Sequence, residues 1–500
     1  MVMRLSRLAA AVRAELVGDD IEVSGLAVDS REVRAGDLFV AQRGATSDGL
    51  EFLDEARRRG ALALCAEAAR DGLPTLVLSD PRSAVPRLAA TLYGHPARAL
   101  RLIGITGTLG KTSTALLVQS ALEASGLGVG VIGSLGVRIR GRVRETGMTT
   151  PDAPTIHRAL RAMADAGVGL AALEVTSHAL ALGRVEGLEF GLGVFTNLVL
   201  DEHLDFHRTP EEYLRTKLRF LDHLDPGAPL VYNRDDVRVT EAVERDAGRR
   251  ARPLVGVSLA GEPGATVVLR GIRSDAAGSA FALEVLQALP RLEGGVVAPQ
   301  LVPLVLPVFG FQQVANAALA AVTALIAGAS PLGVTEAVAE VAPIHRRMEL
   351  VRQAAPAILD DTSGNPRTLR AVFDSIRAIP HRGLRIAFGI RGARGAEINR
   401  RLAATLAELV RARTGATPVR IVVTASEEAA GPRDRVTGEE RSAVEQVLRD
   451  GGVSYRFEPT LAAAVDAVLD GWAPDDLVLL LGAQGMDRAS ELAQARLGPS

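Results

Sequence analysis

The feature that most constrains this 500-residue chain is a glycine-rich turn between an apolar run and a helical pattern. Residues 100–106 form the apolar run, which has the composition of a buried strand. Ala115, Val118 and Leu122 then recur on one face of a helix. Between them lies Gly-Thr-Leu-Gly-Lys-Thr at 107–112. In this setting backbone N–H groups and a helix N-terminus hold phosphate, so the segment predicts a nucleotide-binding α/β domain.

The residues of this turn have distinct expected roles. Lys111 would neutralise the β- and γ-phosphates of a nucleotide, and the Thr112 hydroxyl would reach Mg²⁺. The strict pattern requires glycine where this chain has Ile105, so the string is a shortened variant. A plain turn with a solvated lysine is the alternative, and the coincidence of strand, turn, Lys-Thr and helix disfavours it. The expected nucleotide contacts here are Gly107, Thr108, Gly110, Lys111, Thr112 and Ser113. The loop alone fits a kinase, a GTPase or an ATPase, so other residues must indicate the reaction.

Length and patterning predict three α/β domains. A chain of 500 residues exceeds what one hydrophobic core usually supports, since domains commonly hold about 100–200 residues. Strand-like and helical runs alternate on both sides of the breakers at 94–98, and again after Pro343. We expect a small α/β domain at 1–98, a central P-loop-type domain with a parallel sheet at 99–335, and a Rossmann-like α/β domain at 336–500.

Charge and cysteine content exclude several classes of protein. A formal net charge of −2 supplies no global positive field, so we expect no nucleic-acid partner. The single cysteine, Cys65, stands in an apolar run, where a buried thiol is expected, and it rules out an intramolecular disulfide. Arginines interrupt the apolar residues of the N-terminus, so neither a signal peptide nor a membrane insertion is expected. We expect a cytoplasmic monomer.

Glu174 is the first candidate outside the turn. It lies in Leu173-Glu-Val-Thr-Ser-His178, which has the pattern of a buried strand that ends in polar groups. That position places Glu174 at the carboxyl edge of the sheet, where ligands of parallel α/β sheets bind. A carboxylate at this edge suits Mg²⁺. A helix cap or a surface charge is the alternative interpretation.

Two further candidates follow along the chain. The stretch 201–207 is dense in histidine and acidic residues, including His203, and resembles a metal or acid–base site. A single histidine of this kind is more often structural. Lys217 lies on an amphipathic helix that begins at Tyr213, where a lysine is ordinarily a solvated surface charge.

Taken in order, these strings resemble the Mur ligase family. The resemblance implies an ATP-dependent amide ligase that extends a UDP-linked cell-wall precursor through an acyl phosphate, with Mg²⁺ as a further cofactor. The implied partners are UDP-N-acetylmuramoyl-L-alanyl-D-glutamate and a free amino acid. The matching residues and strings are Val28-Asp-Ser-Arg-Glu32, Gly107 to Thr112, Thr149-Thr-Pro-Asp152, Glu174 to His178, Arg184, Thr196-Asn197, His203-Leu-Asp-Phe-His207, Lys217, Asn233-Arg-Asp-Asp236 and Asn316.

The resemblance also implies roles for single residues. Lys111, Glu174, His203 and Lys217 form the implied catalytic set, with Lys217 as a carbamate. Mg²⁺ would be held by Thr112, Glu174, His203 and that carbamate. Asn316 would lie by the adenine, and further ATP contacts are Arg347, Asp361 and Asn365. The implied contacts of the UDP-muramoyl peptide are Ser30, Arg31, Thr149, Thr150, Thr176, Ser177 and Arg184. By this resemblance, residues 1–98 would be the uridine-nucleotide-binding domain that holds the UDP-muramoyl peptide, 99–335 the central ATP-binding domain and 336–500 the C-terminal ligase domain.

Departures from the family pattern lie mainly after residue 340. The strings 360–366 and 482–486 lean toward the family member that adds a dipeptide. The Asp-Asn-Pro-Arg motif that selects diaminopimelate has no match, because Thr-Ala-Ser-Glu-Glu-Ala-Ala stands at 424–430. The sequence therefore does not identify the added amino acid, although we expect it not to be diaminopimelate. A dipeptide-adding relative, a ligase for another acceptor and a non-catalytic nucleotide-binding homologue are the alternatives.

Overall fold

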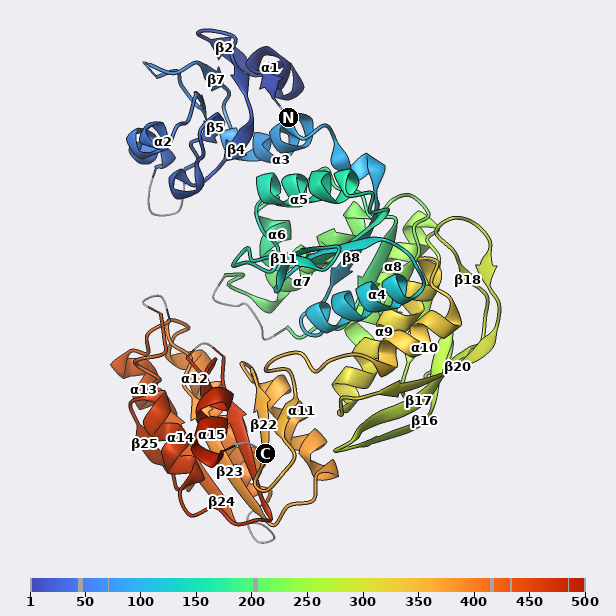
Figure 1. Ribbon diagram of the computed structural model, residues 1–500, viewed down its shortest axis with the longest axis vertical. Coiled ribbons are helices and arrows are strands. Elements are labelled where there is room, and N and C mark those ends of the chain that lie inside the picture. The colour runs from blue at the N-terminus through green and yellow to red at the C-terminus, as the bar shows by residue number, and fades with distance from the viewer. Residues whose placement is uncertain are drawn as a thin grey trace. The chain divides into compact units, whose positions relative to one another are not determined.

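The structure is a computed structural model of the chain, and it describes residues 2–43, 48–70, 72–200, 206–413, 418–431, 434–483 and 485–498. The described fold forms two compact units (Figure 1). The first unit comprises Met1–Leu269, Leu283–Val302 and Asn316–Ala337, and the second comprises Arg270–Ala282, Pro303–Ala315 and Val338–Ser500. Helices alternate with largely parallel sheets in both units, which confirms the predicted α/β class. The three domain boundaries expected from the sequence stay a prediction.

A five-stranded sheet of order β2-β7-β6-β5-β4 forms the N-terminal part of the first unit. Its strands β4 to β7 are parallel, and β2 is antiparallel to β7. Cys65 is fully buried in β6, as expected, and burial raises the pKa of its thiol to about 12. The elements are β2 (Glu15–Val17), β4 (Gly25–Ala27), β5 (Asp37–Val40), β6 (Ala63–Ala66), β7 (Thr75–Val77), α1 (Leu5–Val12), α2 (Leu53–Arg58) and α3 (Pro81–Leu92), with a separate pair of β1 (Met3–Arg4) and β3 (Glu22–Val23).

The phosphate-loop candidate belongs to an eleven-stranded sheet of order β11-β10-β9-β12-β8-β13-β14-β15-β16-β17-β20. The neighbouring strands β9, β12, β8, β13, β14, β15 and β16 run parallel to one another, as predicted. Strand β10 is antiparallel to both β9 and β11. The strands are β8 (Arg101–Thr106), β9 (Val129–Gly133), β10 (Gly136–Ile139), β11 (Arg142–Arg144), β12 (Leu170–Val175), β13 (Leu192–Phe195), β14 (Leu230–Asn233), β15 (Leu254–Ser258), β16 (Val267–Asp275), β17 (Gly278–Val285) and β20 (Gln300–Leu306).

Along the chain, a helix stands between most consecutive parallel strands of this sheet. Helix α4 packs on β8, β9 and β12. The alternation stops after β15, because β16 to β20 follow one another without a helix, which the sequence patterning did not predict. The remaining elements are α4 (Lys111–Ala124), α5 (Ala153–Asp165), α6 (Ser177–Ala181), α7 (Pro210–Leu218), α8 (Val237–Arg250), α9 (Phe311–Ile326), α10 (Pro331–Ala339), β18 (Leu289–Pro290) and β19 (Val296–Val297).

The C-terminal part of the second unit is a six-stranded sheet of order β21-β22-β26-β23-β24-β25. All neighbours are parallel except β21, which pairs antiparallel with β22. Ile386 and Phe388 enter one buried cluster and Ala387 enters another, so β23 is covered on both faces. The elements are β21 (Glu349–Arg352), β22 (Ala357–Asp361), β23 (Gly383–Gly389), β24 (Val419–Thr424), β25 (Arg456–Glu458), β26 (Asp476–Leu481), α11 (Pro366–Ser375), η5 (Ile376–Ala378), α12 (Ala396–Arg411), α13 (Gly438–Asp450), α14 (Leu461–Leu469) and α15 (Ala489–Leu497).

This arrangement agrees with the Rossmann-like expectation for the C-terminal region. Strands β21 and β25 and helices α13, α14 and α15 add elements that the sequence patterning did not identify. None of the helices in the described part of the chain combines the length and the apolar character that a membrane crossing requires.

Candidate ATP and acceptor site

The phosphate-loop candidate joins β8 to α4 in a conformation that needs glycine at two positions. Gly107 has φ +137°, and a Cβ there would lie 2.0 Å from Thr196 Oγ1. Gly110 has φ +84° and caps α4, and a Cβ there would lie 2.1 Å from Asn316 Oδ1. Both positions lie in the backbone region that side chains disfavour. The close approach also places Asn316, from α9, directly beside the loop.

Side chains from the segment after β13 hold the middle of the loop. The amide of Asn197 brackets Leu109: its Oδ1 accepts from the Leu109 N–H at 2.9 Å, and its Nδ2 donates to the Leu109 carbonyl at 3.0 Å. Thr196 Oγ1 donates to the same carbonyl at 2.6 Å. These contacts use only the backbone of residue 109, so they do not depend on its side chain.

Lys111 lies against the loop that it follows. Its Nζ donates to the carbonyls of Gly107 and Thr108, each at 2.9 Å. The N–H groups of the first turn of a helix have no carbonyl within the helix to bond, so the start of α4 offers donors to an anion beside this ammonium. Phosphate binding would redirect the lysine from the two loop carbonyls to the phosphate oxygens.

A carboxylate and two hydroxyls meet at the carboxyl edge of the sheet. Glu174 lies near the end of β12, with 1% of its surface exposed. Its Oε2 accepts from Thr112 Oγ1 at 2.9 Å, and its Oε1 accepts from the Ser134 N–H at 2.9 Å. Gly133 allows this approach, because a Cβ there would lie 2.1 Å from Glu174 Oε1. The predicted placement of Glu174 at this edge is confirmed, and neither a helix cap nor a surface charge describes it.

This donor set suits Mg²⁺, which prefers carboxylate and hydroxyl oxygens together with phosphate oxygens. Within the described ranges no group of three or more His, Cys, Asp or Glu side chains could hold a metal ion by itself. A Mg²⁺ site here would therefore use phosphate oxygens of ATP in addition to Thr112 and Glu174. His203, the predicted histidine ligand, lies outside the described residues.

Lys217 is buried, so the interpretation of this residue as a solvated surface charge is wrong. It lies in the last turn of α7 with 1% of its surface exposed, and its Nζ donates to the Gly107 carbonyl at 3.0 Å. Burial, with the neighbouring charge of Lys111, holds the pKa of its amine well below the usual range. The neutral amine is the form that reacts with CO₂, so the environment suits the expected carbamate.

Most of the predicted acceptor contacts converge beside Glu174. Thr150 Oγ1 donates to the Glu174 carbonyl at 2.7 Å and lies 3.0 Å from Thr176 Oγ1. Arg184 Nη1 donates to the Thr150 carbonyl at 2.7 Å. Ser177 begins α6, and its buried Oγ finds no hydrogen-bond partner among the described residues. A buried hydroxyl of this kind is suited to bond a ligand.

Ser134 is a site residue that the sequence interpretation missed. Its Oγ lies 2.9 Å from Thr149 Oγ1 and 3.2 Å from Thr112 Oγ1. Ser134 therefore joins an expected acceptor contact to an expected metal ligand. A serine in the turn after β9 carries no chemical signal of its own, and only the neighbouring β12 brings Glu174 to it.

Ser30 and Arg31 lie on a short 3-10 turn, η1 (Ser30–Glu32), which follows β4 in the five-stranded sheet. Ser30 Oγ donates to Glu55 Oε2 at 2.7 Å. Arg31 Nε donates to Asp29 Oδ1 at 2.9 Å, and its guanidinium is largely exposed. Asp29 thus presents the arginine at the surface of this sheet, where contact with a uridine nucleotide stays a prediction.

Three predicted ATP contacts gather at the carboxyl end of β22 in the second unit. Asp361 accepts from the Met348 N–H at 2.9 Å and from Ser363 Oγ at 2.6 Å, and Asn365 caps α11. Arg347 Nη1 donates to Thr362 Oγ1 at 2.6 Å. Each side chain thus has a local structural role, and its contact with nucleotide stays a prediction.

The buried cation beside them is Arg346, which the sequence interpretation did not single out. It is 2% exposed, and its guanidinium bonds Asp360 Oδ1 at 3.1 Å and Asp487 Oδ1 at 2.6 Å. Burial raises the pKa of Asp360 to about 6, against the opposing charge of Arg346. This ion pair ties the segment before β21 to β22 and to the segment after β26.

Three protein-family profiles match the chain. They describe the Mur ligase family catalytic domain over residues 22–90, the Mur ligase middle domain over 105–324, and the Mur ligase glutamate ligase domain over 346–484. The three matches follow one another along the chain and together cover most of it. The phosphate loop and Glu174 lie within the match to the middle domain.

Similar proteins include the UDP-N-acetylmuramoyl-L-alanyl-D-glutamate–2,6-diaminopimelate ligases of Corynebacterium efficiens and Streptomyces avermitilis. Both are 32% identical, covering 96% of this chain and 90% of the first protein, and 98% of this chain and 93% of the second. A crystal structure of MurF from Acinetobacter baumannii shares the fold, with a TM-score of 0.70 at 18% identity over 99% of both chains.

The relatives are similar over nearly the whole length, so the similarity is not limited to the nucleotide-binding part. The chain belongs to the Mur ligase family, and it is an ATP-dependent, ADP-forming ligase of peptidoglycan precursor synthesis.

Proposed function

We propose that this ligase joins an amino acid to the free carboxylate of UDP-N-acetylmuramoyl-L-alanyl-D-glutamate. The observation that carries the proposal is the similarity to two ligases named for this acceptor, which extends over 96% and 98% of the chain. The cluster of Thr150, Thr176 and Arg184 beside Glu174 supports it, because it adjoins the phosphate loop with polar groups suited to an anionic acceptor.

The proposed reaction has two steps. A carboxylate oxygen of the acceptor attacks the γ-phosphorus of ATP, ADP leaves, and an acyl phosphate forms. The amine of the amino acid then attacks the acyl carbon, phosphate leaves, and the nitrogen loses a proton as the amide forms. Lys111 and the N–H groups at the start of α4 stabilise phosphate charge during the first step.

Mg²⁺, when bound, would neutralise phosphate charge, and Thr112, Glu174 and Lys217 as a carbamate would hold it. Ser134 keeps Glu174 oriented through its N–H. The buried position of Lys217 excludes water from the amine and lowers its pKa, which favours the neutral form that carbamate formation requires.

We propose that the amino acid added is not diaminopimelate, although the relatives are named for it. The stretch 424–430 supplies neither the asparagine nor the arginine that the family's selective motif would provide. Its Glu428 is already engaged, because its two carboxylate oxygens accept from the N–H groups of Leu461 and Ala462, each at 3.0 Å, at the start of α14.

The test is mass spectrometry of the product made from ATP, the UDP-muramoyl dipeptide and a mixed pool of amino acids that includes diaminopimelate and D-alanyl-D-alanine. A product extended by one amino acid other than diaminopimelate supports both proposals. Exclusive diaminopimelate incorporation refutes the selectivity proposal alone. A dipeptide product would instead favour the alternative suggested by the strings 360–366 and 482–486. Phosphate release that is independent of the acceptor would refute the acceptor assignment.

Acceptor binding has a separate test by calorimetry. We expect affinity for a uridine nucleotide, weakened in the Arg31→Ala variant because the exposed guanidinium is lost. Arg215→Ala serves as the control, since Arg215 is exposed on α7. If the wild-type protein shows no affinity for uridine nucleotides, the proposed cell-wall acceptor is refuted, whereas the assignment of the ATP site is unaffected.

A further inference from the structure

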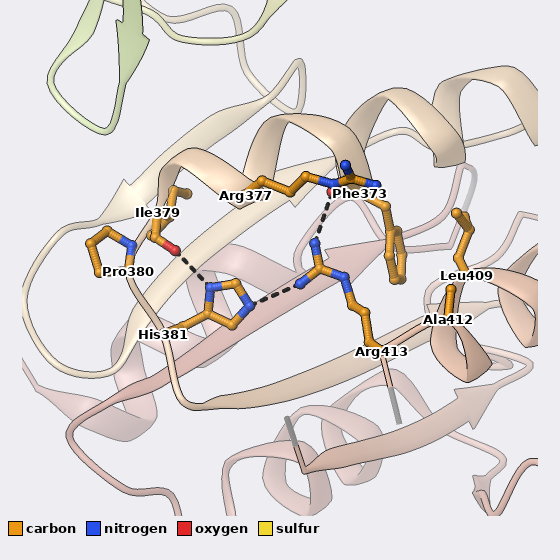
Figure 2. A pocket seen from close by; sticks show the side chains of 8 residues that line it. All are labelled: Phe373, Arg377, Ile379, Pro380, His381, Leu409, Ala412 and Arg413. Atoms are coloured by element: carbon orange, nitrogen blue, oxygen red, sulfur yellow. Dashed lines mark hydrogen bonds between the residues drawn. The ribbon is translucent and has the colours of Figure 1, made fainter. Parts of the chain in front are cut away.

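A pocket of about 440 Å³ lies in the second unit, away from the predicted ATP contacts of that unit. It is lined by Phe373, Arg377, Ile379, Pro380, His381, Leu409, Ala412 and Arg413 (Figure 2). Residues 379–381 precede β23, and residues 409–413 close α12, so the pocket lies at the amino ends of the parallel strands. Asp361 ends β22, at the opposite edge of the same sheet.

Arg413 is the central polar group of this pocket. Its Nη1 donates to His381 Nε2 at 3.1 Å, and its Nη2 donates to the Phe373 carbonyl at 3.0 Å. A guanidinium cannot accept a hydrogen bond, so His381 Nε2 must be the acceptor and the proton must lie on Nδ1. That nitrogen donates to the Ile379 carbonyl at 2.7 Å, which holds the imidazole and thereby the arginine in place (Figure 2).

This arginine lacks a carboxylate partner among the residues that the structure describes. Both of its acceptors are neutral, and they use two of its five N–H donors, which leaves three for a ligand. Burial and the charge of Arg377 lower the pKa of Arg413, against the opposing charge of Asp374. A half-buried cation with neutral partners is a costly arrangement that a bound anion would relieve.

The charge and the walls of the pocket define the kind of anion. Arg377 is paired with Asp374 at 3.4 Å, and the charge of Asp374 also acts on Arg413, so Arg377, Arg413 and Asp374 together leave one net positive charge at the pocket. A single charge matches a monoanion better than a phosphate dianion, and the guanidinium fork matches the two oxygens of a carboxylate. Phe373, with its ring centroid 5.6 Å from the Arg413 Cζ, and Leu409 add apolar surface.

We propose that this pocket binds a small organic carboxylate, with the carboxylate on the Arg413 guanidinium and the apolar body against Phe373 and Leu409. The volume lies within the range of small-molecule sites, about 300–1,000 Å³. The site is distinct from the proposed ligase reaction, because it occupies the other edge of the six-stranded sheet.

The probe is 4-fluorobenzoate, followed by fluorine NMR line broadening on the full-length enzyme saturated with Mg²⁺ and a non-hydrolysable ATP analogue. The analogue prevents the probe from occupying the phosphate loop. We expect saturable binding that inorganic phosphate does not displace. 4-Fluorobenzyl alcohol, which has the same ring without the charge, should bind at least about tenfold more weakly.

The decisive variant is Arg413→Gln, matched by Arg411→Gln, which removes the same charge from an exposed position in the last turn of α12. Binding should weaken about tenfold or more in Arg413→Gln and change less than about twofold in Arg411→Gln. If Arg413→Gln does not fold, Leu409→Glu places a competing carboxylate in the wall and should abolish binding. The proposal would be overturned if the wild type showed no saturable binding or if phosphate displaced the probe. It would also be overturned if Arg413→Gln, or Leu409→Glu where Arg413→Gln does not fold, bound the probe as tightly as the wild type.

Discussion

The sharpest test of the catalytic assignment is the replacement of Lys217 by methionine. Lys217 is 1% exposed, so truncation to alanine would also open a cavity and cost about 2–5 kcal/mol. Methionine keeps most of the apolar stem and removes only the amine. The two interpretations of Lys217, a structural anchor of the loop and a carbamate ligand, then predict different results.

If Lys217 only anchors the loop, its loss removes one hydrogen bond. The Gly107 carbonyl would not be left unpaired, because Lys111 Nζ donates to the same oxygen at 2.9 Å. The free energy of unfolding should fall by about 1 kcal/mol, and the rate should change little. If Lys217 is a carbamate, an anionic oxygen ligand disappears, and kcat should fall roughly a thousandfold, or about 4 kcal/mol of activation free energy.

The assay is ADP release that depends on both the UDP-muramoyl dipeptide and the amino-acid pool, with urea unfolding as the measure of stability. Arg215→Ala is the matched control, since it removes an exposed basic residue from the same helix and should change neither quantity. Two further results are expected only if Lys217 is a carbamate. Removal of CO₂ should lower wild-type activity until bicarbonate is added, and acetate should partly restore Lys217→Ala, which has space for it. A rate for Lys217→Met within a few-fold of wild type would refute the carbamate.

Three other predictions concern the phosphate loop and, separately, the buried ion pair of the second unit. Lys111→Ala should abolish ATP turnover with little change in the unfolding free energy, and near-normal turnover would contradict the phosphate-loop assignment. Gly110→Ala should weaken ATP binding measured by calorimetry at least about tenfold, because φ +84° is strained for alanine and the new Cβ would lie 2.1 Å from Asn316 Oδ1; unchanged affinity would show that the loop adapts. Asp360, whose pKa burial raises to about 6, binds a proton more tightly in the folded than in the unfolded chain. Wild-type stability relative to Asp360→Asn should therefore rise as the pH falls from 7 toward 4, by up to about 3 kcal/mol in urea unfolding, and a difference that does not change with pH would refute the buried-carboxylate argument.

Local sequence determined the elements that carry the chemistry. The apolar run before Gly107 and the periodic residues after Thr112 were enough to predict β8, the turn and α4, because strand and helix patterning depends on neighbours along the chain. The polar residues after Leu173 likewise predicted that Glu174 lies at the carboxyl edge. The order of these strings identified the family, which the profiles and the relatives confirm.

The environment of those residues depended on contacts between distant segments. Lys217 has the sequence setting of a surface lysine, and only the packing of α7 behind Gly107 buries its amine and lowers its pKa. Ser134 reaches Glu174 because β9 and β12 are adjacent in the sheet. His381 and Arg413 meet only when α12 returns to the amino ends of the strands. Sequence patterning reports how a residue relates to its neighbours in the chain, whereas burial, pKa and hydrogen-bond partners depend on which segments the tertiary fold brings into contact.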